Sequence, residues 1–482
     1  MRKGLIVLLV AAVAVAFALP AMADLTPKNL NVSGFYRAKA WVSNFHGLGT
    51  LANEPPTSAF VEQRARFKFD FGTENVKAVW FTEIDMNWGD LGGQVGRNQG
   101  GALGGDSINV ETKNLYLWFK VPDTSIDFTV GLQNQTDAYA GVLYGAADMA
   151  GIFMTGKFEP VTFKLGWAKL YENQLQKTDD ATLYVAEVNL LPAKAVSLGL
   201  NFYALQDDTG RAAGINTKLN PLDQTTANAT WILANRKLLL YTPGFNATIK
   251  AGPATITGFA FYQWGTAEPM LPGGVDIDVN AYGGDLRADL KLGPANVFLE
   301  GLYQSGDDKT DEYNAPIGLG DYQGPAAALN GPAGNSSYTR TRMQILLASW
   351  DAINIAQCLV GCSGGVYGDS LGLQGRGLWH VAAGANFDVT KSLKVEANAG
   401  YAAAVKMRSA TAPGRPADAA FRDKDLGTEV NAGINYNIAK GLDFGLFGAY
   451  LFLGDFNKTS ATGPGSDPED PWSGYARVNY AF

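Results

Sequence analysis

The sequence predicts an all-β protein, a transmembrane antiparallel β-barrel of about 18 strands with short turns at one end and long loops at the other. Three observations predict this fold class. Apolar and polar residues alternate in many runs, short turns and long connections follow each other along the chain, and the last alternating run ends in the terminal Phe482. A barrel of 16 strands is the alternative, because residues 206–250 and 306–376 are difficult to divide into strands.

The first 23 residues have the pattern of a secretory signal peptide. Arg2 and Lys3 form a basic start, residues 5–19 are apolar, and Ala21-Met22-Ala23 is a small-residue cleavage site. An uncleaved membrane anchor is the alternative, but the apolar stretch is shorter than a membrane span. We therefore divide the chain into a signal peptide, 1–23, and a barrel domain, 24–482.

The composition of the mature chain fits a membrane barrel. Removal of Arg2 and Lys3 leaves 36 basic against 46 acidic residues, a net charge of −10, which gives no reason to expect a nucleic-acid partner. The chain has 57 Gly, 25 Phe, 20 Tyr and 10 Trp, and only 17% of its residues are charged. A soluble all-β protein is the alternative at this stage, and repeated aromatic faces without helices to cover them argue against it.

The first alternating runs cover residues 30–43, 60–71 and 76–88. In each run, charged residues occupy one face of the predicted strand, and mostly apolar residues occupy the other face. A charged face opposite an apolar face is typical of a barrel around an aqueous lumen. The predicted lumen-lining residues are Arg37, Lys39, Glu62, Arg64, Arg66, Lys68, Glu83 and Asp85.

Residues 111–151 contain a hairpin followed by a long connection. Two alternating runs, 110–119 and 126–132, flank the turn Pro122–Ser125. The connection 134–150 is rich in Gly and Ala and is the third long loop of the chain. The residues of this loop that we single out are Asp137, Tyr139, Tyr144 and Asp148.

Short turns and long loops determine the predicted strand count. The short turns are Gly72–Asn75, Pro122–Ser125, Glu159-Pro160, Pro192–Ala195, Gly252-Pro253, Gly293-Pro294, Thr390–Ser392 and Ala439–Gly441. The long loops are 44–59, 89–107, 134–150, 172–180, 206–236, 265–277, 306–376, 406–425 and 455–471. Eight turns join 16 strands, and the strands that start at Leu30 and Trp472 make 18. A helix is predicted within the seventh loop, over 340–357.

A barrel of this size encloses an aqueous channel and not a packed core, so the sequence favours transport. If the third loop folds inward, Asp137 and Asp148 face the basic residues of the first two strands and set a transverse field. The alternative is a surface loop, with the basic residues neutralised by neighbouring Glu62, Asp70, Glu83 and Asp85.

Three segments carry a family resemblance: FVEQRARFKFDF, VWFTEIDMNWGD and GALGGDSINVETKNLYLWFKVPDTSIDFTVGLQ. Over about residues 58–155 the chain resembles the outer-membrane homotrimeric porins of delta-proteobacteria, within the general bacterial porins. The resemblance implies a trimer of passive diffusion channels for small hydrophilic solutes and ions. An alginate-export-like channel, or another channel for an anionic solute, is the alternative; the mixed charges of the lumen argue against it.

The C-terminal strand also implies partners. A terminal aromatic residue resembles the signal that the barrel-assembly machinery reads in outer-membrane proteins, which points to Phe482 as its contact and to the Gram-negative outer membrane as the location. Outer-membrane lipid and lipopolysaccharide are the expected surroundings. The acidic loop groups 307–312 and 467–470 are divalent-cation candidates, with solvated loop charge as the other interpretation.

Other function classes find little support. Cys358 and Cys362 predict a small loop disulfide in an exported protein, since no His lies near them for a metal site. The two histidines, His46 and His380, lie in the first long loop and on the polar face of a predicted strand, where a lumen-facing histidine is a simpler interpretation than a catalytic base. We therefore predict no enzyme activity, no metal and no cofactor. A barrel phospholipase and a sheath around a partner protein remain the less favoured functions.

Overall fold

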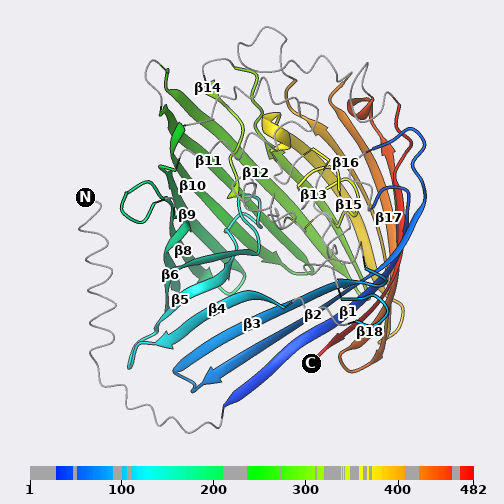
Figure 1. Cartoon of the computed structure of the whole chain (residues 1–482), viewed down its shortest axis with the longest axis horizontal. Helices are drawn as coiled ribbons and strands as arrows, with labels where there is room; N and C mark the ends of the chain where they lie inside the picture. Colours follow the sequence, from blue (N-terminus) through cyan, green and yellow to red (C-terminus); the bar gives the residue numbers. More distant parts are fainter. Residues whose placement is uncertain are drawn as a thin grey trace.

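The computed structural model is a closed antiparallel β-barrel (Figure 1). It describes residues 29–46, 51–90, 100–105, 110–172, 174–209, 236–270, 274–309, 312–319, 338, 340, 342–347, 358–361, 366–367, 372–407, 423–458 and 467–482. The predicted signal peptide, 1–23, lies outside these residues.

Eighteen strands form the wall, which confirms the preferred strand count. They are β1 (Leu30–Ser43), β2 (Ser58–Gly72), β3 (Val76–Asn87), β4 (Glu111–Lys120), β5 (Ile126–Gln135), β6 (Ala147–Phe158), β7 (Val161–Tyr171), β8 (Ala181–Ala193), β9 (Val196–Asp207), β10 (Arg236–Ala251), β11 (Ala254–Pro269), β12 (Ile277–Leu292), β13 (Ala295–Gln304), β15 (Leu378–Asp388), β16 (Leu393–Ala404), β17 (Asp425–Ala439), β18 (Leu442–Leu453) and β19 (Trp472–Ala481). The two-residue β14 (Glu312–Tyr313) is not part of the wall; it pairs in parallel with the loop end of β12.

The barrel closes between the first and last strands. β1 pairs antiparallel with β19 from Phe35–Ala481 to Ser43–Ser473, and with β2 on its other side. At the end of the seam, the amides and carbonyls of Gly34 and Phe482 exchange two hydrogen bonds of 3.1 Å. Closure satisfies the edge N–H and C=O groups that an open sheet would expose to lipid. In Figure 1 the blue β1 accordingly lies beside the red C-terminal strands.

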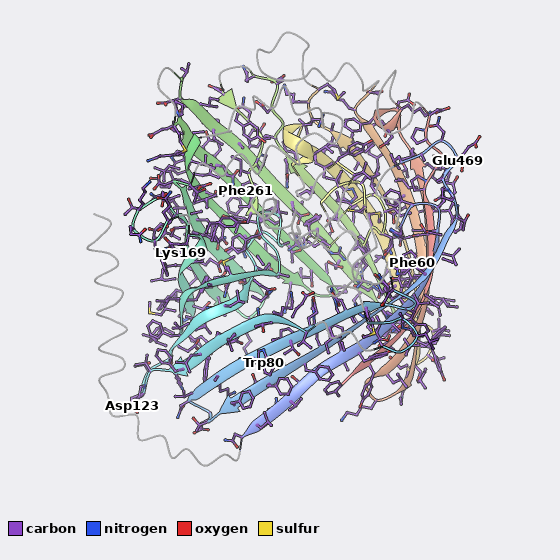
Figure 2. The ribbon with its side chains drawn as sticks, in the orientation of Figure 1. Phe60, Trp80, Asp123, Lys169, Phe261 and Glu469 are labelled. Carbon is purple, nitrogen blue, oxygen red and sulfur yellow. The ribbon has the colours of Figure 1, made fainter. Side chains whose placement is uncertain are left out.

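The two faces of each strand differ as the alternation predicts. On β9, Leu200 and Phe202 point outward and are 70% and 39% exposed, whereas Asn201 and Tyr203 point inward and are buried. Large apolar residues are exposed in the same way on the outer face of the other strands; Trp80 on β3 is one of them (Figure 2). Such a surface is unfavourable in water and suits lipid hydrocarbon.

All eight predicted short turns separate neighbouring strands at one end of the barrel. Asp123 lies in one of these turns, and Glu469 lies in a long loop at the opposite end (Figure 2). The predicted boundaries shift by a few residues: β8 includes Pro192 and Ala193, and β11 continues to Pro269. These differences are small because turn chemistry is local, whereas the last paired residue depends on the neighbouring strand.

The helical segments among the described residues are two 3₁₀ turns, η2 (Leu373–Gly375) and η4 (Asp455–Asn457). None of the described helices could span a membrane. The predicted loop helix over 340–357 is wrong for residues 342–347, which are irregular and end in a parallel bridge between Leu347 and Val360. The prediction rested on the near-helical spacing of Leu346, Trp350 and Ile353; Leu346 is buried, and the other two lie outside the described residues.

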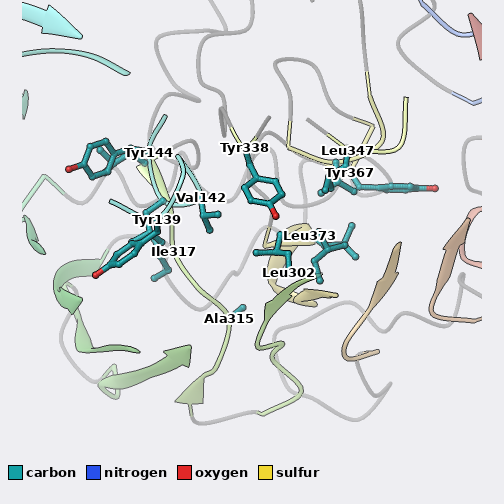
Figure 3. Packing of buried hydrophobic residues seen from close by; sticks show 14 of the residues in the cluster. Tyr139, Val142, Tyr144, Leu302, Ala315, Ile317, Tyr338, Leu347, Tyr367 and Leu373 are labelled. Atoms are coloured by element: carbon teal, nitrogen blue, oxygen red, sulfur yellow. The ribbon is translucent and has the colours of Figure 1, made fainter. Parts of the chain in front are cut away.

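An apolar cluster lies inside the loop end of the barrel (Figure 3). It joins the loop 136–146, described parts of the loop 305–377, Phe45 and Leu51 of the first loop, Phe456 of η4, and inward residues of β6–β13 and β15–β18. No residue of β1–β5 or β19 belongs to this cluster. Two inward loops therefore cover one part of the wall, and β1–β5 with β19 form the other part.

Candidate functional site

The predicted lumen residues of β1–β3 share one face of the sheet. The register places Arg37 opposite Arg64, Arg64 opposite Asp85, Lys39 opposite Glu62, and Arg66 opposite Glu83. Residues that face each other across paired strands lie on the same side. Tyr36 and Trp80, on the alternate positions, are exposed on the outer surface. All eight predicted residues therefore lie on the inner wall; that they line a conducting path remains a prediction.

Arginines on β2 are held by carboxylates on β3. Arg64 binds Asp85 in a bidentate pair, Nε–Oδ1 2.6 Å and Nη2–Oδ2 2.7 Å, and its Nη2 lies 3.3 Å from Glu83. Arg66 donates to Glu83 from Nε, and Lys68 lies 3.2 Å from Asp70. Bidentate Arg–carboxylate geometry is strong and directional. The alternative given above, in which neighbouring carboxylates neutralise the basic residues, describes this part of the wall.

Nearer the loop end, Lys39 is fully buried between aromatic rings. Its Nζ lies 4.6 Å from the ring centroid of Tyr475 and 5.2 Å from that of Trp41. The indole N–H of Trp41 donates to Glu62, 2.8 Å away. Cation–π contacts stabilise an ammonium group that is removed from water. Lys39 and Glu62 therefore lie within the wall and are not presented to the lumen.

His46, just beyond β1, packs edge-on against Trp41 with ring centroids 4.7 Å apart. Burial, and secondarily the positive charge of Lys39, lower the pKa of His46 from 6.5 to about 3. The side chain is therefore neutral at physiological pH and belongs to the packed rim of the wall. His380, on β15, is also buried, and its Nδ1 lies 2.8 Å from the carbonyl oxygen of Tyr401.

Asp137 organises the third loop from within. Its carboxylate accepts hydrogen bonds from the backbone N–H groups of four residues at 2.6–2.9 Å: Tyr139, Gly141, Leu143 and Tyr144. Burial raises the pKa of Asp137 to about 6, although the four N–H groups oppose the shift. The carboxylate is thus a structural acceptor for a tight loop and is not a charge directed at the opposite wall.

The third loop packs against the inner faces of β9 and β11. The Tyr139 ring lies 5.5 Å from Tyr203, 5.6 Å from Phe259 and 5.2 Å from Phe261, centroid to centroid. The Tyr203 hydroxyl accepts from the Ala138 amide, 2.8 Å away, and donates to Glu187 at 2.9 Å. Figure 3 shows Tyr139, Val142 and Tyr144 within this packing. The loop therefore lies against the inner wall, and its narrowing of a channel remains a prediction.

The predicted bounds of the third loop are wrong, and Asp148 does not belong to it. The strands β5 and β6 end at Gln135 and start at Ala147, so the loop is 136–146 and Asp148 belongs to β6. Its carboxylate accepts from Lys113 Nζ at 2.7 Å, Asn114 Nδ2 at 2.8 Å and Asn134 Nδ2 at 3.0 Å. Neither Asp137 nor Asp148 binds the basic residues of β1 and β2. Both carboxylates have local donors, and the transverse field expected from these two residues remains a prediction.

A second inward segment, within 305–377, is attached to the wall by carboxylates that the sequence analysis did not single out. Glu429 on β17 accepts from the backbone N–H groups of Gln344, Ile345 and Leu346 at 2.7, 2.9 and 2.7 Å. Arg342 lies 2.7 Å from Glu396 on β16. Three consecutive N–H groups on one buried carboxylate fix the backbone of this segment firmly.

The same segment meets β12 and β13 at a network of buried charges. Arg340 binds Asp285, and the Tyr338 hydroxyl lies within hydrogen-bond distance of both Asp285 and Glu300. Arg287 forms a bidentate pair with Asp289 at 2.7 and 2.8 Å and lies 3.0 Å from Glu300. Alternating Asp285, Arg287 and Asp289 could have identified the inner face of β12 from the sequence. No local signal indicates that a loop covers them.

Two further predictions concern the loops. Cys358 is disulfide-bonded and buried, whereas Cys362 lies outside the described residues, so their pairing remains a prediction. In the acidic groups, Asp470 accepts from the Leu453 amide at 2.9 Å and Asp307 from the Asn314 amide at 3.2 Å. Among the described residues, no group of three His, Cys, Asp or Glu side chains could hold a metal ion.

Comparison with known proteins identifies the fold. No protein-family model and no curated protein matches the chain. Solved structures do: Acinetobacter baumannii OccAB1, with a TM-score of 0.53 and 12% identity over 96% of this chain and 99% of that one, and Pseudomonas aeruginosa OccK8 (OprE), with 0.52 and 11% over 95% and 98%. A BenF-like porin from Pseudomonas fluorescens Pf-5 gives 0.51 and 10% over 95% and 99%. At these identities the likeness establishes a shared barrel fold.

Proposed function

We propose that this protein is an outer-membrane porin, a passive diffusion channel for small hydrophilic solutes and ions. One observation carries the proposal: a closed 18-strand barrel whose outer face is apolar and whose inner wall bears charged side chains in contact with water. Barrels of 16 to 18 strands enclose an aqueous channel, whereas barrels of about 8 strands are filled by side chains. The shared fold with a structure described as a BenF-like porin supports the same function.

The location and assembly are parts of this proposal. An outer-membrane location agrees with the signal-peptide pattern of residues 1–23 and with the exposed apolar belt of the barrel. The terminal Phe482 is proposed as the contact for the barrel-assembly machinery, and lipid with lipopolysaccharide as the surroundings. A homotrimer is proposed from the resemblance of residues 58–155 to the delta-proteobacterial porins.

Planar-bilayer recording of the detergent-folded protein tests the function. We expect discrete conductance steps that scale with salt concentration, in groups of three if the protein is a trimer. The control is the same preparation unfolded by heat, which should give no steps. Absence of current from protein whose strand content and heat-modifiable gel mobility prove folding would contradict a channel and favour a partner sheath or a barrel enzyme.

A further inference from the structure

The inner wall of the barrel contains two charged regions with different access to water. The first region, the β1–β3 charged patch, consists of Arg37, Lys39, Glu62, Arg64, Arg66, Lys68, Asp70, Glu83 and Asp85. The arginines and Lys68 become more exposed toward the short-turn end: 11% for the Arg64 side chain, 21% for Arg66 and 38% for Lys68. The wall under the apolar cluster is covered instead by the two inward loops. Solutes in the lumen would therefore meet the exposed members of the β1–β3 charged patch, above all Arg66 and Lys68.

Given the proposed porin function, on which this inference rests, we propose that the channel wall is charge-balanced and that the channel discriminates little between anions and cations of equal size. The β1–β3 charged patch contains five basic and four acidic residues, although the mature chain as a whole carries a net charge of −10. The acidic excess of the protein is thus absent from this wall.

Three cations of the patch, Arg64, Arg66 and Lys68, each have a carboxylate beside them. The Arg64 pairs lie at 2.6 and 3.3 Å, Arg66 contacts Glu83 directly, and Lys68 lies 3.2 Å from Asp70. A cation and a carboxylate this close act on a passing ion as a dipole, whose field falls off faster with distance than that of a single charge. Salt further screens it over about 8 Å at physiological ionic strength. The wall therefore offers a weak net potential to an ion in the lumen.

The remaining two cations of the patch, Lys39 and Arg37, contact neighbouring side chains. Lys39 is enclosed by the rings of Trp41 and Tyr475. Arg37 donates to Asn479 at 3.2 Å, and the amide of Asn479 in turn donates to Asp443 at 2.9 Å. A channel specialised for anionic solutes needs cations that lack local carboxylate partners. Arg64, Arg66 and Lys68 do not meet this requirement, because each has such a partner.

The same pairing continues along the described wall beyond the patch. Lys113 lies 2.7 Å from Asp148 on β6, Lys164 lies 2.8 Å from Glu187 on β8, and Arg477 on β19 lies 3.0 Å from Asp443 on β18. The last two pairs join neighbouring strands, and the first joins β4 to β6 across β5. Balance is therefore a property of the described wall and not of a single pair.

The direct test compares three sugars of nearly equal size and different charge: glucose, gluconate and protonated glucosamine. Proteoliposomes containing the full-length protein are swollen in each solute. The three solutes should enter at rates within about threefold of one another, since no net wall potential favours either sign of charge. In a KCl gradient the reversal potential should lie close to zero.

The possible outcomes separate the inference from the function. Swelling in gluconate and in glucosamine that differs by much more than about threefold, or a strongly selective reversal potential, overturns the charge-balanced wall and leaves the porin intact. No swelling with any solute, together with no current from folded protein, overturns the porin itself.

A pair of variants tests the mechanism. Asp85→Asn removes one partner of Arg64 and should lower the permeability ratio of K⁺ to Cl⁻ by roughly two- to fivefold, because one cation then lacks its full counter-charge. The double variant Arg64→Gln/Asp85→Asn removes both charges and should return the parental selectivity. Equal shifts in the single and double variants would contradict the inference.

Asp123→Asn is the matched control. It makes the same chemical change in the β4–β5 turn, away from the wall, and Asn tolerates the positive φ of 58° at this position. Its selectivity should equal the parent's. Folding of every variant is verified by heat-modifiable gel mobility, and the three-sugar comparison on the parent protein does not depend on any variant.

Discussion

The β1–β3 charged patch and the loop-covered wall of β12, β13 and β17 use carboxylates differently. In the patch, Asp85 and Glu83 bind arginine side chains of the neighbouring strand, and the cations remain partly in water. On the loop-covered wall, Glu429 binds three backbone amides of 344–346, and Asp285 and Glu300 bind Arg340, Arg287 and Tyr338.

This difference shows that residue type and strand phase do not determine the role of an inward carboxylate. The same acidic residue at an inward position balances a wall cation in one region and anchors a loop in the other. What distinguishes the two is coverage: Glu429 is completely buried beneath the loop, whereas the Arg64–Lys68 row is open to the lumen at its short-turn end. Replacements should therefore affect stability in one region and selectivity in the other.

The largest effect is expected at Glu429. Glu429→Gln removes the charge and turns one acceptor oxygen into an NH₂ donor that faces backbone N–H groups, which should destabilise the barrel by about 2–4 kcal/mol and loosen residues 344–346. Urea unfolding in detergent measures the stability, and open-channel noise in bilayers should increase. The control is Glu396→Gln, whose carboxylate is 18% exposed and binds Arg342. Equal losses of unfolding free energy in both variants would contradict the proposed difference between the buried Glu429, which binds backbone amides, and the partly exposed Glu396, which binds Arg342.

Asp137→Asn tests the third loop and should have the next largest effect. The amide retains one acceptor oxygen for four N–H donors, so we expect a loss of about 1–3 kcal/mol, confined to opening of residues 136–146. Limited proteolysis of folded protein reports this opening, with Asp123→Asn as the matched control. If cleavage within the loop does not change, the four hydrogen bonds to Asp137 are not what holds it.

His46, which packs beside the patch near the loop end, should make the stability of the barrel depend on pH. Its folded pKa of about 3 lies below the ordinary value of 6.5, so the unfolded chain takes up a proton that the folded chain excludes. The stabilising contribution is complete above pH 6.5 and is lost as the pH falls from 6.5 toward 3, by at most about 1.4 kcal/mol per pH unit. His46→Gln should flatten the pH dependence of urea unfolding in this window. A variant with the same pH profile as the parent would mean that His46 ionises normally in the folded protein.

The smallest effect is expected at Lys68. Its side chain is 38% exposed and pairs with Asp70 at 3.2 Å, a geometry that contributes less than about 1 kcal/mol. Lys68→Ala should therefore leave the urea midpoint nearly unchanged while it shifts the reversal potential slightly toward cations. A large loss of stability would mean that Lys68 contributes to stability as the buried carboxylates of the loop-covered wall do, which would contradict the difference between the two regions.

Most of the barrel is predictable from local sequence. Alternation from Leu30 and from Trp472, and eight turns rich in Gly, Pro, Asp or Ser, identify 18 strands to within a few residues. Alternation also places the charged residues of β1–β3 on one face. These features are local because the side-chain direction of a strand repeats every two residues and because turn residues act within three or four positions.

The partners of those residues were decided by the tertiary structure. The sequence suggested that Asp137 and Asp148 oppose the basic wall, but Asp137 binds its own loop and Asp148 binds Lys113 across β4–β6. The sequence also gave no sign that Glu429 would hold residues 344–346, more than 80 positions away. Strand register and loop placement determine which charges meet, and both depend on contacts between residues distant in the chain. The sequence by itself therefore determined the wall and its faces, and only the tertiary structure decided which wall charges are balanced and which bind the inward loops.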